Sequence, residues 1–101
     1  MSLRESVVMR TWSAEILLEL SSGPKRFNPV LHSITGISDR VLTMRLGDLE
    51  AAGLIDRQVL VGPPVRVIYG LTVRGRAYIE PLERLAAVDA EPVSEEVAQA
   101  V

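Results

Sequence analysis

Cysteine is absent from this chain of 101 residues, and histidine occurs once, as His32. The absence of thiols excludes disulfides, thiolate metal sites, cysteine nucleophiles and thiol-based redox switching. A lone histidine, which we expect to be a partly exposed structural residue, does not build a metal site without further histidine or cysteine ligands. The composition therefore predicts a protein that holds no metal and no cofactor.

Signals for catalysis and for membrane insertion are missing as well. The chain has no glycine loop of the kind that cradles phosphates, and two carboxylate pairs, Glu15 with Glu19 and Glu80 with Glu83, have the spacing of solvated helix faces. No apolar run approaches the ~18 residues of a membrane span, and no signal-peptide core follows Met1. We therefore expect a cytoplasmic protein that is not an enzyme and does not enter the membrane.

Charge is distributed unevenly along the chain. The net charge is −2, which by itself argues against a nucleic-acid partner, yet residues 25–76 hold eight basic and four acidic side chains. Ten of the eleven cations are arginine, whose planar fork suits phosphates and base edges. Residues 89–101 carry four acidic side chains and no basic one. We expect one domain over residues 1–88, followed by an acidic tail at residues 89–101.

Residues 38–53 predict a helix with two distinct faces. Ser38 is a favourable N-cap, and Gly53 readily adopts the left-handed geometry that ends helices. Three leucines fall on one stripe at helical spacing and are expected in the core: Leu42, Leu46 and Leu49. The opposite face carries small or flexible side chains and one cation: Arg40, Thr43, Met44, Gly47 and Ala51. Such a face is able to lie against another molecule.

A shorter helix is expected just before this one. Asn28 followed by Pro29 predicts an N-cap and a first helical position, so residues 29–34 predict a short helix that ends at Gly36. Lys25 to Phe27 is expected to be extended, with Phe27 pointing into the core. A short helix, a turn at Gly36 and a capped second helix form the pattern of a helix-turn-helix, whose second helix enters the major groove of DNA.

The two ends of the chain predict further helices. Residues 7–21 have helical spacing of apolar side chains and stop at Gly23-Pro24. Trp12 and Met9 in this segment suit either the core or a partner surface. At the other end, Thr72 is expected to cap a last helix, which Pro81 must kink or interrupt.

Between them, residues 54–61 and 66–71 alternate apolar and polar side chains and predict two strands, separated by Gly62-Pro63-Pro64. A hairpin directly behind a helix-turn-helix is a wing. The sequence therefore predicts an α+β winged helix-turn-helix: a three-helix core with a two-stranded β-hairpin wing and a C-terminal helix.

These residues resemble the HxlR-type winged-helix transcriptional regulators, which are close to the MarR group. The matching residues span about two-thirds of the chain. They are Trp12 with Ile16 to Leu20, Gly23 to Asn28, Gly36 to Ser38, Arg40 to Leu42, Arg45-Leu46, Leu49-Glu50, Gly53 to Ile55, Pro64, Tyr69, Leu71-Thr72 and Gly75-Arg76. The resemblance implies a dimeric bacterial regulator on a pseudo-palindromic operator, with residues 38–52 in the major groove and the wing, residues 62–66, at the minor groove.

The chain departs from this family in two places. Some members carry an N-terminal cysteine that senses oxidants or electrophiles, but this chain has none, so the inducing signal stays open and we expect thiol reagents to leave DNA binding unchanged. The Gly-Lys that usually precedes the tryptophan is Arg10-Thr11 here, which affects the expected dimer contacts.

The expected DNA contacts divide into two groups. Arg40, Thr43 and Met44 lie on the outer face of the second helix, where side chains reach base edges. Residues on its flank, before the short helix and around the wing are expected to anchor the backbone: Lys25, Arg26, Ser38, Arg45, Arg57, Pro64 and Arg66.

The terminal helices hold more apolar positions than one small core needs, so we expect a homodimer. Its expected contacts are Val8, Met9, Trp12, Ile16, Leu82 and Leu85.

A different function is compatible with the same fold. A winged helix also serves as a protein-interaction module without DNA binding, because fold alone does not dictate function. Such a module has no need of five cations that converge on a duplex, namely Lys25, Arg26, Arg40, Arg45 and Arg66. Their layout favours DNA binding.

Overall fold

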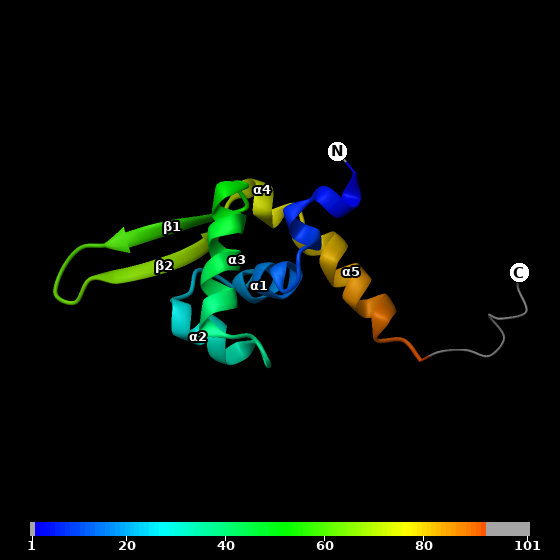
Figure 1. Cartoon of the computed structure of the whole chain (residues 1–101), viewed down its shortest axis with the longest axis horizontal. Helices are drawn as coiled ribbons and strands as arrows, with labels where there is room; N and C mark the ends of the chain where they lie inside the picture. Colours follow the sequence, from blue (N-terminus) through cyan, green and yellow to red (C-terminus); the bar gives the residue numbers. More distant parts are fainter. Residues whose placement is uncertain (1, 93–101) are drawn as a thin grey trace, which may run out of the picture.

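The computed structural model describes residues 2–92, which form an α+β winged helix (Figure 1). Its elements in chain order are two short 3₁₀ helices, η1 (Leu3–Glu5) and η2 (Val7–Met9), then α1 (Ser13–Leu20), α2 (Phe27–Ser33), α3 (Asp39–Ala51), β1 (Ile55–Leu60), β2 (Arg66–Leu71), α4 (Val73–Arg76) and α5 (Ile79–Asp89). The expected fold class is therefore confirmed. The hairpin and α5 project from opposite sides of the helical body.

The core lies among α1, α2 and α3, and the base of the hairpin closes it. Every side chain of the expected leucine stripe on α3 is buried, as are the inner residues of the other two helices. The fully buried apolar side chains are Ile16, Leu17, Leu20, Val30, Leu42, Leu49, Leu54 and Ile55. Most of these residues lie on helices at helical spacing, so the amphipathic pattern of the sequence predicted most of this core.

The expected single helix over residues 7–21 is wrong. The chain forms η2, becomes extended at Arg10 and takes left-handed geometry at Trp12, with φ of 75°, before α1 begins at Ser13. The indole of Trp12 then lies against the turn between α2 and α3, so that a Cβ atom added at Gly36 would lie 3.5 Å from it. The helix is therefore broken at the point where Trp12 packs against this turn, and the helical spacing of apolar residues gives no sign of that break.

The start of α2 also differs from the expectation. Arg26 is the N-cap and Phe27 is the first helical residue, so Asn28 is not the cap and Phe27 is not extended. Phe27 is only partly buried, although it packs against the core. Pro29 still lies in the first turn, where its missing N–H would have no helical acceptor.

The strands β1 and β2 pair in antiparallel register, from Ile55 opposite Leu71 to Leu60 opposite Arg66. Lys25 adds an isolated bridge to β2, since its N–H donates to the carbonyl of Tyr69 and its carbonyl accepts from the Tyr69 N–H. This bridge confirms the expected extended conformation at Lys25. It ties the segment before α2 to the wing.

The C-terminal helix is interrupted before Pro81, between α4 and α5. Thr72 caps α4 as expected, because its hydroxyl accepts from the Gly75 N–H. Pro81 lies in the first turn of α5, where no backbone bond is lost. Gly75 packs so closely on the end of α3 that a Cβ there would lie 1.9 Å from the Leu54 carbonyl oxygen. The expected boundary at residue 88 falls within α5, and most of the expected acidic tail lies outside the described residues.

Candidate nucleic-acid interface

The helix α3 has well-defined ends. The Ser38 hydroxyl accepts from the Val41 N–H at 3.2 Å, which satisfies one of the free donors of the first turn. Gly53, with φ of 78°, turns the chain out of the helix in left-handed geometry. Both end signals in the sequence are therefore confirmed, and they fix the direction of α3 over the core.

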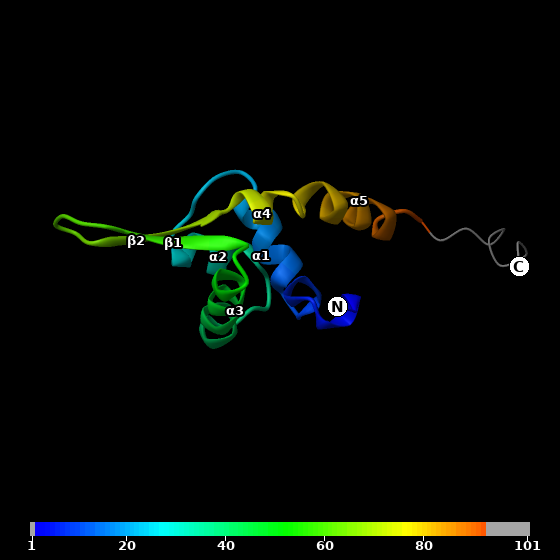
Figure 2. The same cartoon turned by 90° about the horizontal axis from the view of Figure 1, so that it is seen from above.

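One side of α3 is open to solvent over its whole length. Arg40, Thr43, Met44 and Gly47 are exposed, and Met44 keeps 51% of its surface. The helix lies on one face of the molecule, with α4 and α5 toward the other (Figure 2). Nothing among the described residues covers the three side chains that we expect to reach base edges.

Two of the expected anchors lie together beside α2. Arg26 and Arg66 both line a hollow of about 430 Å³ between the start of α2 and the wing, with Asn28, Pro64 and Val65 among its other walls. Neither arginine has an ion pair within the part of the chain that the structure describes. The hollow therefore has two cations of the expected DNA surface on its walls.

Lys25, one of the expected phosphate contacts, is engaged within the chain. Its ammonium pairs with the Glu19 carboxylate at 2.6 Å, and its side chain is only 28% exposed. This hydrogen bond from Lys25 holds the pKa of Glu19 below its ordinary value, against the opposing effect of burial. Lys25 thus ties the strand-like segment to α1.

Arg45, another expected phosphate anchor, also makes contacts within the chain. Its Nε donates to the Thr11 carbonyl at 2.7 Å, and its guanidinium pairs with Asp48 one turn further along α3, also at 2.7 Å. Arg10 approaches Asp48 from the other side at 3.1 Å. The three charges hold α3 against the segment between η2 and α1.

The remaining expected DNA residues are exposed. Arg57 lies on β1 opposite Tyr69, Pro64 lies in the loop of the wing, and Ser38 serves as the cap of α3. Their contacts with DNA stay predictions.

The expected dimer residues do not form one surface. Ile16 is fully buried in the chain's own core, so it is not placed to contact a second chain. Trp12 packs on the turn at Gly36 and is partly exposed, and its dimer contact stays a prediction. The other residues belong to an apolar groove of about 540 Å³ between the N-terminal segment and α5. Its apolar walls include Leu3, Val8, Met9, Pro81, Leu82 and Leu85.

His32 is exposed on α2, and the described residues contain no cluster of three or more potential metal ligands. No helix among them is long and apolar enough to cross a membrane.

The Arg10–Asp48–Arg45 cluster was missed by the sequence reasoning. The spacing of Arg45 and Asp48, three residues apart on a helix, is a local signal for their ion pair. The contact of Arg45 with Thr11 spans 34 positions and has no such signal.

The chain was compared with known proteins. A family model described as HxlR-like helix-turn-helix matches residues 7–96. The HTH-type transcriptional regulator YodB of Bacillus subtilis (strain 168) is 42% identical over 72 residues, which are 71% of this chain and 64% of YodB. The aligned segment thus spans slightly less than two-thirds of that relative.

Solved structures give the same result for the fold. The reduced form of YodB from B. subtilis superposes with a TM-score of 0.78 at 34% identity, covering 93% of this chain and 99% of that structure. A structure described as a transcriptional regulator of the MarR family from Enterococcus faecalis V583 gives a TM-score of 0.77, also at 34% identity, over 96% of this chain and 84% of that one.

Proposed function

This chain belongs to the HxlR-like helix-turn-helix family of transcriptional regulators, and we propose that it binds double-stranded DNA in a sequence-specific manner. In the proposed complex α3 enters the major groove and the wing approaches the adjacent minor groove. The observation that carries the proposal is the open face of α3, where Arg40, Thr43 and Met44 protrude from a helix whose other face is fully packed. Arginine in this position offers the two parallel donors that guanine accepts.

The cations around α3 support the same proposal. Arg26 and Arg66 flank the hollow beside α2, and neither is neutralised by an ion pair among residues 2–92. We assign them to backbone phosphates, where they add affinity and salt dependence but no base preference. Lys25 and Arg45 are left out of this assignment, because each already serves a contact within the chain.

A homodimer is part of the proposal. No residue of α5 is fully buried within the chain, and Met9 and Leu85 keep 53% and 56% of their surface at the apolar groove. A second copy that covers this groove would remove that surface from water, and it would present two α3 helices to successive major grooves. An operator with two related half-sites follows from this symmetry.

The dimer has its own test. Sedimentation equilibrium of the wild type should give twice the 11.1 kDa chain mass, and Leu85→Glu should give the single chain. The matched control is Val61→Glu, which places the same charge on the wing, at a side chain that is 94% exposed. A monomeric wild type would overturn the dimer, and a dimer that survives Leu85→Glu would overturn the assignment of its interface to the apolar groove.

The alternative, a protein-interaction module, has less support. It leaves the unpaired arginines around α3 without a role, and the relatives are described as transcriptional regulators. The decisive experiment is selection of duplexes from a random pool by the purified chain, followed by fluorescence anisotropy on the enriched sequence. Enrichment of a two-fold symmetric site, bound much more tightly than random duplex, supports the proposal. The proposal is contradicted if the chain retains no duplex even at low salt, or if it retains duplexes without enriching any sequence.

A further inference from the structure

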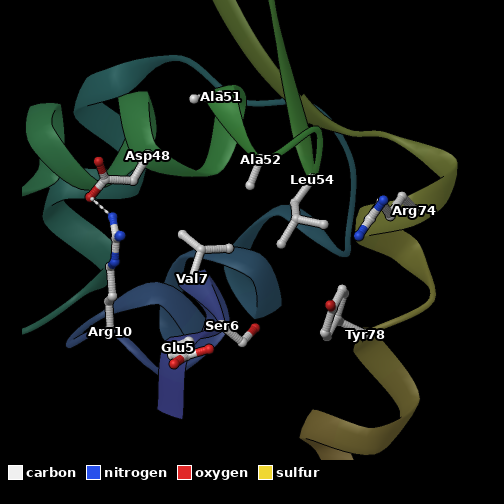
Figure 3. A pocket seen from close by; sticks show the side chains of 10 residues that line it. All are labelled: Glu5, Ser6, Val7, Arg10, Asp48, Ala51, Ala52, Leu54, Arg74 and Tyr78. Atoms are coloured by element: carbon white, nitrogen blue, oxygen red, sulfur yellow. Dashed lines mark ion pairs between the residues drawn. The ribbon is translucent and has the colours of Figure 1, made fainter. Parts of the chain in front are cut away.

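A second hollow, of about 340 Å³, lies behind α3 and is distinct from the proposed DNA surface (Figure 3). Its walls come from three parts of the chain: the N-terminal segment, the last turns of α3 with Leu54, and α4 with Tyr78. The volume falls at the lower end of the range of small-molecule sites, about 300–1,000 Å³. It shares only Arg74 and Tyr78 with the apolar groove.

The charged groups of this pocket lie on two opposite sides. The Arg10–Asp48 ion pair forms one side, and Arg74 and Tyr78 form the other, with Val7 and Leu54 between them. The charge of Asp48 is neutralised twice, because its carboxylate forms ion pairs with Arg10 and with Arg45. Arg74 has no ion pair among the described residues. Its guanidinium is therefore a cation that is not neutralised, at the wall of a partly enclosed space.

The remaining walls are polar at one end and apolar in the middle. The other carboxylate, Glu5, accepts from the backbone N–H of Ser2 at 3.2 Å and is exposed. Ser6 lies beside it, and its hydroxyl oxygen accepts from the Val8 N–H, which leaves the hydroxyl proton free to donate. Ala51, Ala52, Val7 and Leu54 provide an apolar surface between the two charged sides.

We propose that this pocket binds a small organic carboxylate with a compact apolar body. The carboxylate lies against Arg74, whose fork donates two parallel hydrogen bonds to such a group, and the Tyr78 hydroxyl is a further donor on the same side. The body packs on Val7 and Leu54. Inorganic anions leave this apolar surface uncovered, so the pocket favours an organic anion over phosphate or sulfate.

The site joins segments that belong to different proposed functions. Ala51 and Ala52 end the helix whose beginning carries Arg40, and Tyr78 borders the groove assigned to the dimer. A ligand in this pocket would thus lie between the C-terminal end of α3 and Tyr78, the N-cap of α5. The proposal concerns ligand binding alone and holds whether or not the chain binds DNA.

The test is an amide NMR titration of the full chain without DNA. The probe is cyclohexanecarboxylate, which has no aromatic ring to shift signals through space, and the neutral control of the same shape is cyclohexanecarboxamide. The carboxylate is expected to bind with a dissociation constant of about 1 mM or below, and the amide about tenfold or more weakly. The shifted amides should cluster at Ser6, Val7, Ala52, Leu54 and Arg74.

Two variants locate the charge that matters. Arg74→Met keeps the length of the side chain and is expected to weaken binding of the carboxylate about tenfold or more, to the level of the amide. Arg84→Met removes the same charge from the exposed surface of α5 and should leave binding unchanged. Unshifted spectra elsewhere report that both variants remain folded.

Four results would overturn the proposal, three of them from the titrations already described. Those three are equal affinity for the carboxylate and the amide, equal carboxylate affinity of Arg74→Met and the wild type, and the absence of carboxylate-induced shifts at the pocket residues. Inorganic phosphate serves as a last comparison: shifts of the same amides at the same concentrations would assign the site to anions in general and contradict the organic ligand.

Discussion

The helices α3 and α5 are both amphipathic and of similar length, with 13 and 11 residues, but they differ in where their apolar faces lie. The apolar stripe of α3 is buried by the chain itself, and its leucines keep at most 2% of their surface. The helix α5 has no fully buried residue: Ile79 and Leu82 are partly buried against the core, whereas Leu85 and Val88 remain more than half exposed.

This difference indicates what each helix still lacks. The apolar face of α3 is already buried within the chain. Its exposed side chains, Arg40, Thr43 and Met44, are therefore available to a polar and charged partner such as DNA. The apolar side chains of α5 gain stability only when another apolar surface covers them. We therefore assign α3 to DNA and α5 to a second copy of the chain.

The largest expected effect tests the packing side of this contrast. Leu42→Ala should lower the free energy of unfolding by about 2–5 kcal/mol, because it leaves a cavity in the core. Leu85→Ala on α5 should cost less than about 1 kcal/mol in dilute protein. Urea unfolding at two protein concentrations measures both. The loss for Leu85→Ala should grow with concentration, since it weakens the dimer, whereas a constant and large loss would mean that Leu85 packs within its own chain.

The next effect concerns base recognition by α3. Arg40→Ala should cost about 1–3 kcal/mol on the selected duplex and relax discrimination at one base pair in each half-site. Arg84→Ala on α5 removes the same charge from the other helix and should leave both quantities unchanged. Anisotropy titrations on the selected and on mismatched duplexes compare them. Equal losses for the two variants would show that only net charge matters.

A smaller effect separates free from paired cations. Arg26→Ala and Arg66→Ala should weaken binding to all sequences alike and reduce the slope of log affinity against log salt by about one unit for each phosphate that the arginine no longer neutralises, roughly two units per dimer. Lys25→Ala should leave the slope unchanged, because Glu19 already neutralises this side chain. A reduced slope for Lys25→Ala would return Lys25 to the DNA surface.

The smallest effect is the pH dependence of the Lys25–Glu19 pair. The hydrogen bond from Lys25 lowers the pKa of Glu19 from its ordinary value of 4.5, so the stabilisation is fully present above about that pH. It is lost as the pH falls through the lower pKa of the folded chain. Glu19→Gln should therefore flatten the acid limb of the stability curve by less than about 1 kcal/mol, whereas Glu15→Gln, at an exposed position on the same helix, should not. Equal acid limbs for Glu19→Gln and the wild type would contradict this assignment.

The parts of the fold that the sequence predicted are those with local signals. Ser38 and Thr72 cap the helices that follow them, and β2 has the expected bounds, because caps and strand alternation act over a few residues. The break at Trp12 and the close approach of Gly75 to Leu54 depend on packing between distant segments. Neither feature has a local signal in the sequence.

The same distinction applies to the candidate site. The open face of α3 follows from helical geometry, and Arg40, Thr43 and Met44 are exposed as expected. The contacts of Lys25 and Arg45 within the chain were not predicted, since a cation in the sequence does not show whether a partner is near in space. Glu19 and Thr11, which occupy them, belong to the N-terminal part of the chain.

The most direct test of the account is hydrogen–deuterium exchange of the chain, free and saturated with the selected duplex, at a concentration where the dimer is intact. The account predicts that DNA adds protection in residues 38–47 of α3 and residues 61–66 of the wing, while residues 79–89 of α5 exchange equally in both states. Added protection confined to α5, with α3 unchanged, would contradict it.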